Sequence, residues 1–234
     1  MTRPPIQEEI YQDLIAVGNE VGHLWHHHDI FWKTIEVMNN NSRVLELGGD
    51  LFHWLINSYI EAGSVAVRRQ LDRDTRSVSL RNVLRKLEQN HTSFAKVEFQ
   101  TSIAFSQDSH FHNPIKWQEA GNDFDRLFGL GGLQLSPRVV QADAAFLETG
   151  SAAIREQVNK EIAHTDRSGM KGPKATGTIF EKCLTHLDEL TVKYLYLVTG
   201  KQADSLRGLF VYDFEEVFTF PWIERQPAGA ADEL

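Results

Sequence analysis

Apolar residues recur every three or four positions along much of this chain, and this spacing is the strongest constraint on its fold. The period matches the 3.6 residues of an α-helical turn and gives each helix one apolar stripe. The clearest stripe lies at the start of the chain and consists of Ile6, Ile10, Leu14, Val17, Val21 and Leu24. No succession of strands joined by tight turns interrupts the pattern. We therefore expect an all-α fold, a helical bundle of roughly five to seven helices.

The other long helices are predicted from similar stripes and from end signals. They are expected over residues 44–71, 137–164 and 178–199, with a shorter one starting near residue 80. Gly48 and Gly49 weaken the first of these, since each glycine costs about 1 kcal/mol relative to alanine in an exposed helix. Gly200 is a natural stop for the last one.

Residues 90–136 break the regularity, because Gly, Asn and Pro punctuate them heavily. We expect an irregular insertion there, with one short helix around 117–128, inside a single helical domain of residues 1–200. The rest, residues 201–234, is expected to form an acidic tail packed on the bundle. Its aromatic residues alternate as in a half-buried extended segment and are Phe210, Tyr212, Phe214, Phe218, Phe220 and Trp222. The same stripe would also suit a partner.

Charge is unevenly distributed along the chain. The 24 Lys and Arg residues and 32 Asp and Glu residues give a formal net charge of −8, which argues against a protein that wraps nucleic acid. Between Arg68 and Lys86, however, seven basic residues occur with two acidic ones, a local charge of +5. This segment is either a solvated helix with internal ion pairs or a basic surface for an anion. The total charge therefore does not exclude a protein that grips a short stretch of nucleic acid.

The composition excludes several other classes. A single cysteine, Cys183, rules out an intrachain disulfide and a Cys-rich zinc framework, and its apolar neighbours predict a buried thiol. No uncharged apolar run approaches the roughly 18 residues that cross a bilayer. The acidic start of the chain is unlike a signal peptide. We therefore expect a cytoplasmic protein without membrane contact.

Histidines cluster near the N-terminus, where His23 with His26 or His27 has the spacing of two metal ligands on one helix face. Neighbouring histidines point in different directions around a helix, so further ligands have to come from elsewhere, for example from His53, His110 or His112. A metal-binding bundle is therefore a minor alternative to surface histidines. The glycines of residues 129–132 lack the Lys-Ser/Thr of a phosphate loop and predict an ordinary loop.

The most suggestive segment runs from Val158 to Asp166 and has the sequence Val-Asn-Lys-Glu-Ile-Ala-His-Thr-Asp. Its Asn…Ala-His near the end of a late helix, followed by an acidic residue, resembles the HEPN superfamily. Together with the arginine-rich residues 68–77 it is most similar to HEPN-like proteins of the abortive-infection type. The resemblance covers about residues 44–200. It implies an all-helical, usually dimeric protein of a phage-defence or toxin-type system, with RNA, a second copy, and an antitoxin or another protein as partners.

The resemblance also implies a catalytic site, with Asn159, His164 and Asp166 as candidates. The superfamily signature is an arginine, four to six residues and then a histidine, but residues 157–159 contain no arginine. Metal-independent RNA cleavage needs a base for the ribose 2′-hydroxyl, which His164 can supply because its ordinary pKa lies near neutral pH. It also needs a cation for the charge that develops on the phosphate. No metal or other cofactor is expected.

The missing cation can come from elsewhere in the chain. Arg69, Arg73 or Arg76 can approach in space, a second subunit can contribute a residue, and Lys160 lies four residues before His164, on the same helix face. These residues are the candidates for contacts to phosphate or RNA. The structural alternative is a histidine that stabilises a helix C-terminus and an Asn159 amide that bonds to a neighbouring helix.

Three functional hypotheses remain open. The first is a metal-independent endoribonuclease of a phage-defence or toxin-type system that uses His164. The second is a catalytically inactive HEPN-like module for protein interaction or RNA binding. The third, a minor one, is a metal-binding helical bundle around residues 23–28. The first hypothesis requires Arg69, Arg73 or Arg76 to lie near His164 in a shared groove, within one subunit or across a dimer.

Overall fold

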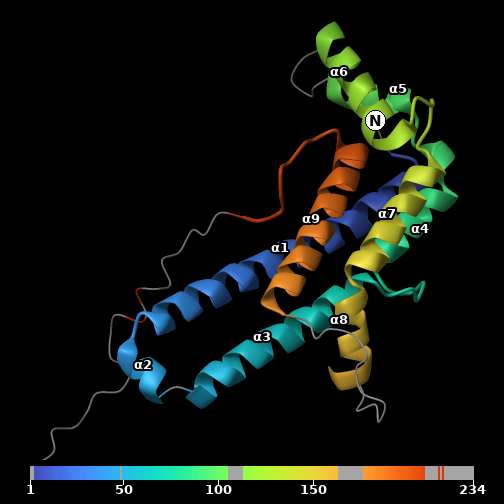
Figure 1. Ribbon diagram of the computed structural model, residues 1–234. Helices are drawn as coiled ribbons and strands as arrows, with labels where there is room; N and C mark the ends of the chain where they lie inside the picture. The colour runs from blue at the N-terminus through green and yellow to red at the C-terminus, as the bar shows by residue number, and fades with distance from the viewer. Residues whose placement is uncertain are drawn as a thin grey trace, which may run out of the picture.

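The computed structural model describes residues 3–47, 49–104, 113–162 and 176–208, together with the single residues 216 and 218. Within these ranges the chain is mostly helical (Figure 1). The α-helices are α1 (Pro5–Asn39), α2 (Ser42–Leu47), α3 (Gly49–Gln70), α4 (Leu80–Gln89), α5 (Lys96–Ala104), α6 (Pro114–Phe124), α7 (Pro137–Gly150), α8 (Ala152–Gln157) and α9 (Gly177–Thr199). Shorter turns are the 3₁₀-helix η1 (His91–Ser93) and the π-helices η2 (Asp125–Gly129) and η3 (Val158–Ile162). The predicted all-α class is confirmed.

The hydrophobic core lies between α1, α4, α7 and α9. Helices α1 and α9 pack against each other, and so do α4 and α7. The predicted stripe of α1 faces this core, since Ile10, Leu14, Val17 and Val21 are almost completely buried. Each such side chain contributes about 1.5–3 kcal/mol of transfer free energy. The spacing of apolar residues in the sequence therefore accounts for the face that α1 buries.

Helices α1 and α3 extend beyond this core and diverge toward α2 (Figure 1). At its C-terminal half α3 packs against α9, where a Cβ atom on Gly63 would lie only 2.6 Å from Cε2 of Phe180. Glycine is needed at this position because the Phe180 ring occupies the place of a side chain. The same part of α3 contacts α8 and η3, so its C-terminal end is held beside the segment that contains Asn159.

Two of the predicted long helices are divided in the structure. The helix expected over 44–71 consists of α2 and α3, and α3 begins at Gly49, one of the two glycines that weaken a continuous helix. The helix expected over 137–164 is divided at Gly150 into α7 and the following α8 and η3. A Cβ atom on Gly150 would lie 2.5 Å from Nδ1 of His186, so glycine permits the close approach of α7 to α9 at the point of division.

The segment of residues 90–136 is more helical than the irregular insertion that we predicted. The expected short helix corresponds to α6 and η2, and α6 is capped by the Asn113 side chain, which accepts from the backbone N–H groups of Ile115 and Lys116 at 3.1 Å each. Helix α5 is additional. Its buried residues are Phe99 and Ala104, and a spacing of five residues produces no recognisable helical stripe.

The start of the tail lies on α1 and α9. The Asp188 carboxylate accepts hydrogen bonds from the backbone N–H of Leu206, at 2.8 Å, and from the Ser205 hydroxyl, while Arg207 forms an ion pair with Asp29. Most of the aromatic stripe of residues 210–222 falls outside the described residues, so its docking stays a prediction. No helix within the described ranges is long and apolar enough to cross a membrane.

Candidate functional site

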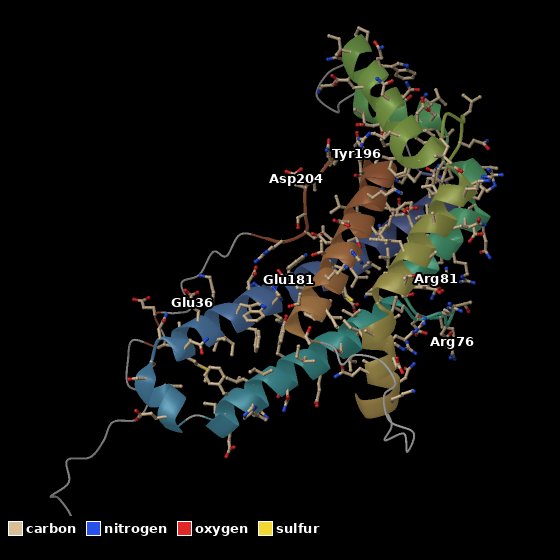
Figure 2. All side chains as sticks on the ribbon, viewed as in Figure 1. Glu36, Arg76, Arg81, Glu181, Tyr196 and Asp204 are labelled. Atoms are coloured by element: carbon tan, nitrogen blue, oxygen red, sulfur yellow. The ribbon has the colours of Figure 1, made fainter. Side chains whose placement is uncertain are left out.

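The basic segment forms the end of α3, a turn over residues 71–79, and α4. Side-chain hydrogen bonds fix the turn: Ser79 Oγ donates to the Asp72 carbonyl at 2.8 Å, and Asn82 Nδ2 donates to the Asp74 carbonyl at 2.6 Å. Gln70 Oε1 accepts from the backbone N–H of Leu80 at 3.0 Å, which ties the turn to α3. The turn lies beside the junction of α7 and α8, where Figure 2 shows Arg76 and Arg81. Its arginines therefore extend from a well-defined backbone.

Within the turn, hydrogen bonds also stabilise the ionised carboxylates. The backbone N–H of Asp74 donates to the Asp72 carboxylate at 3.1 Å and lowers the pKa of Asp72. The Arg76 guanidinium donates to the Asp74 carboxylate at 2.6 Å and lowers the pKa of Asp74. Both acids are therefore charged at neutral pH, and part of the positive charge counted in the sequence is neutralised locally.

Arg68 and Asn159 connect the two segments that carry the family resemblance. Arg68 lies in the last turn of α3, and its Nε donates to Oδ1 of Asn159 at 3.4 Å, a distance at the long end for a hydrogen bond. Asn159 is exposed and belongs to η3. Short π-helical turns are rare and occur often at functional sites. Residues that are 91 positions apart in the sequence thus place an arginine next to the Asn159–His164 motif.

The three predicted arginines have other partners. Arg69 donates to Glu20 of α1 at 2.8 Å, Arg73 donates to Glu148 of α7 at 2.7 Å, and Arg76 pairs with Asp74. Within the described part of the chain none of the three forms a hydrogen bond or ion pair with Asn159, and Arg68 contacts Asn159 instead.

Glu148 joins the turn to α7, because it accepts from both Arg73 and Arg81, the latter at 2.8 Å. Burial alone would raise the pKa of Glu148, but the hydrogen bonds from Arg81 and Arg73 outweigh it and lower the pKa. The carboxylate is thus ionised at neutral pH and holds two guanidinium groups together. Arg73 stays 65% exposed in its side chain and remains accessible to an anion.

The remaining predicted site residues are Lys160, His164 and Asp166. Lys160 pairs with Glu156, one helical turn earlier, with 3.2 Å between Nζ and Oε1. His164 and Asp166 lie outside the described residues, so their proposed roles rest on the sequence. Sequence reasoning counted Arg68 in the basic segment but did not single it out. Arg68 differs from its neighbours only in the structure, where it follows the completely buried Ser64 by four residues and so lies toward the packed face of α3.

The histidine cluster contributes one buried residue. His28 is 3% exposed, and its Nδ1 lies 2.6 Å from the Tyr59 hydroxyl, so the two side chains satisfy each other. Burial lowers the pKa of His28, while Glu181 and Asp29 act in the opposite direction. Within the described ranges no group of three His, Cys, Asp or Glu side chains is placed to hold a metal ion. This arrangement gives the metal-binding hypothesis no support from those residues.

Cys183 agrees with its prediction. The thiol is buried, donates to the Gly150 carbonyl at 3.1 Å, and has a raised pKa because burial disfavours the thiolate. It is therefore a structural residue of α9 rather than a nucleophile.

Comparison with known protein families tests the resemblance to HEPN-like proteins of the abortive-infection type. The family model HEPN_AbiU2, described as AbiU2, matches residues 12–214. The chain belongs to this family. The AbiU2 match spans α1 to α9, which confirms the HEPN-like, abortive-infection character inferred from the two short segments. No curated protein and no solved structure matches the chain. The homodimer, the antitoxin and the cytoplasmic location stay predictions.

Proposed function

We propose that this AbiU2-family protein is a metal-independent endoribonuclease of abortive infection, with Arg68 as the cation and His164 as the acid–base residue. The observation that carries the proposal is the Arg68–Asn159 contact of 3.4 Å. The family signature expects an arginine within the helix that precedes the histidine, but residues 157–159 contain none. Arg68 supplies the guanidinium from α3, next to the beginning of the same motif.

The chemistry requires one proton acceptor and one stabilised anion. His164 would take the proton of a ribose 2′-hydroxyl, whose oxygen then attacks the adjacent phosphorus, while the bond to the 5′-oxygen breaks. The leaving 5′-oxygen takes a proton from a protonated group or from water. The products are a 2′,3′-cyclic phosphate and a 5′-hydroxyl. Arg68 would stabilise the charge on the pentacovalent phosphorus through its guanidinium fork.

The remaining candidates have supporting roles in this proposal. Asn159 orients the guanidinium of Arg68, since its side-chain oxygen accepts from Nε and leaves the terminal nitrogens for phosphate. Asp166, two residues after His164, would orient the imidazole or stabilise its protonated form. Arg73 and Arg76 are strongly exposed and would contact phosphates of the same strand farther from the cleavage point.

The test is cleavage of single-stranded RNA by the full chain in EDTA. We expect the wild type to produce 2′,3′-cyclic phosphate ends, and His164→Ala to lose cleavage without losing RNA binding. Asn159→Ala should slow cleavage less than His164→Ala, because it only repositions Arg68. Equal background cleavage by wild type and His164→Ala would overturn the nuclease proposal.

The absence of an arginine from residues 157–159 favours a second candidate function, RNA binding without cleavage. Without a guanidinium in residues 157–159, the same surface can bind RNA without cleaving it. In this case cleavage stays at background for every variant, while Arg68→Ala and Arg73→Ala weaken RNA binding and reduce its dependence on salt concentration. The cleavage assay therefore separates the two functions, and filter retention at two salt concentrations measures the RNA binding that the second function requires.

A further inference from the structure

A groove of about 610 Å³ runs between α1 and α3, away from the Arg68–Asn159 contact. Leu24 and Ile35 of α1 and Phe180 of α9 are buried along it. Phe31 and Tyr59 stack on each other with ring centroids 3.9 Å apart and form part of its lining. The Tyr59 hydroxyl is bonded to His28, so it adds no free polar group to this lining. The groove is therefore mostly apolar along its length.

The charged groups of the groove are at one end, whereas Thr34 and Ser58 add single hydroxyl groups farther along it. Because Glu20 contacts Arg69 and His28 contacts Tyr59, α1 and α3 run antiparallel along the groove. The charged residues Glu20 and Arg69 line one end of the groove, and the apolar residues Ile35 and Leu55 line the opposite end. The fifteen-residue step from Glu20 to Ile35 corresponds to about 22 Å at 1.5 Å per helical residue. The groove is therefore long and amphipathic.

At the charged end of the groove, Arg69 keeps hydrogen-bond donors beyond the one that contacts Glu20. The Glu20 carboxylate already accepts from Arg69 at 2.8 Å and from the Gln70 side chain. Arg69 uses one terminal nitrogen for this contact, so its guanidinium keeps further N–H donors, and the side chain is 67% exposed. The exposed imidazoles of His23 and His27 line the same part of the groove. An acceptor, in particular an anion, complements this set of donors.

We propose that the groove binds an amphiphile with one aliphatic chain and a carboxylate head. The chain would lie between α1 and α3, and the carboxylate would accept hydrogen bonds from Arg69 and from His23 or His27. A flat aromatic ligand fits less well, because the Phe31 and Tyr59 rings already stack on each other. The proposal goes beyond the ribonuclease function and is independent of it, since it uses Arg69 and not Arg68.

The experiment measures binding of laurate to the full chain by isothermal titration, below the concentration at which laurate forms micelles. Ala62→Trp and Ser58→Phe fill the groove at two separate positions, and Ala16→Trp is a matched control at an exposed alanine of α1 that does not line the groove. Circular dichroism shows whether each variant is folded. We expect Ala16→Trp to bind as the wild type does, and each folded filling variant to lose at least about tenfold in affinity.

The head group is tested with Arg69→Gln and with dodecanol, the uncharged analogue of laurate. A hydrogen bond to a charged group contributes enough that Arg69→Gln should weaken laurate binding by about tenfold and leave dodecanol binding unchanged. The proposal is overturned if laurate shows no saturable binding, or if the filling variants bind it as the wild type does. It is also overturned if Arg69→Gln affects laurate and dodecanol equally, or if sedimentation shows that a second copy covers the groove.

Discussion

Replacement of Gly63 by alanine tests the packing that holds α3, and with it Arg68, in place. A Cβ atom at this position would lie 2.6 Å and 2.7 Å from Cε2 and Cζ of Phe180, well inside ordinary contact distance. The ring cannot move away easily, because Phe180 is 0% exposed and is packed against Tyr59 at 5.3 Å between ring centroids. Something in the α3–α9 contact therefore has to shift.

The magnitude follows from two opposing effects. Overpacking of this kind costs about 1–3 kcal/mol, whereas alanine in place of glycine within a helix gains about 1 kcal/mol. We expect Gly63→Ala to lower the free energy of unfolding by about 1 kcal/mol, and the melting temperature by about 2–4 °C. The control is Gly49→Ala at the first position of α3, where no atom lies within 4 Å of the added Cβ, so a smaller helix gain is expected without any cost of overpacking.

The assay is urea unfolding followed by circular dichroism. It compares the single variants Gly63→Ala, Gly49→Ala and Phe180→Leu with the double variant that combines Gly63→Ala and Phe180→Leu. In the background of Phe180→Leu the smaller side chain leaves room, so the added methyl group should become neutral or stabilising. The reasoning is refuted if Gly63→Ala stabilises the protein as Gly49→Ala does. It is equally refuted if Phe180→Leu leaves the cost of Gly63→Ala unchanged.

Two further predictions concern pH and the tail. The pKa of His28 is lowered by burial from its ordinary value of about 6.5, so below this pH the unfolded chain binds more protons. The free energy of unfolding should therefore fall as the pH decreases from about 6.5 to the lowered pKa. His28→Gln should reduce this fall, whereas the exposed His27→Gln should not. Asp188→Ala removes the acceptor of the Leu206 amide and should cost about 1–3 kcal/mol; hydrogen exchange at this amide should accelerate strongly, and an unchanged rate would contradict the role of Asp188.

The long helices could be predicted from the sequence because their stripes are long enough to define a face. Leu14 of α1 and Leu187 of α9 are buried as this periodicity requires. Helix boundaries could not be predicted in the same way, because they depend on tertiary contacts. The division at Gly150 reflects the His186 side chain of α9, which is distant in sequence. Helix α5 was not predicted because it has too few buried positions to show a period.

The candidate site could be predicted only as two segments. The resemblance identified residues 68–77 and the Asn159–His164 motif, and the structure shows that α3 and η3 contact each other. Which arginine meets Asn159 depends on the rotation of α3 about its axis, and neighbouring arginines differ by about 100° at 3.6 residues per turn. Arg68 therefore contacts Asn159, whereas Arg69 points to Glu20 of α1.

The central claim is that Arg68 provides the cation which the motif around His164 lacks. Its most direct test is the single-turnover rate of RNA cleavage in EDTA, compared between Arg68→Ala and Arg126→Ala. Arg126 is a suitable control because it is an arginine that also contacts one neighbouring side chain, Asp123, but lies on η2, next to α6 at the far end of the molecule (Figure 1). Loss of an electrostatic donor predicts a rate about 10²- to 10³-fold lower for Arg68→Ala and an unchanged rate for Arg126→Ala. Equal rates for the two variants would contradict the claim.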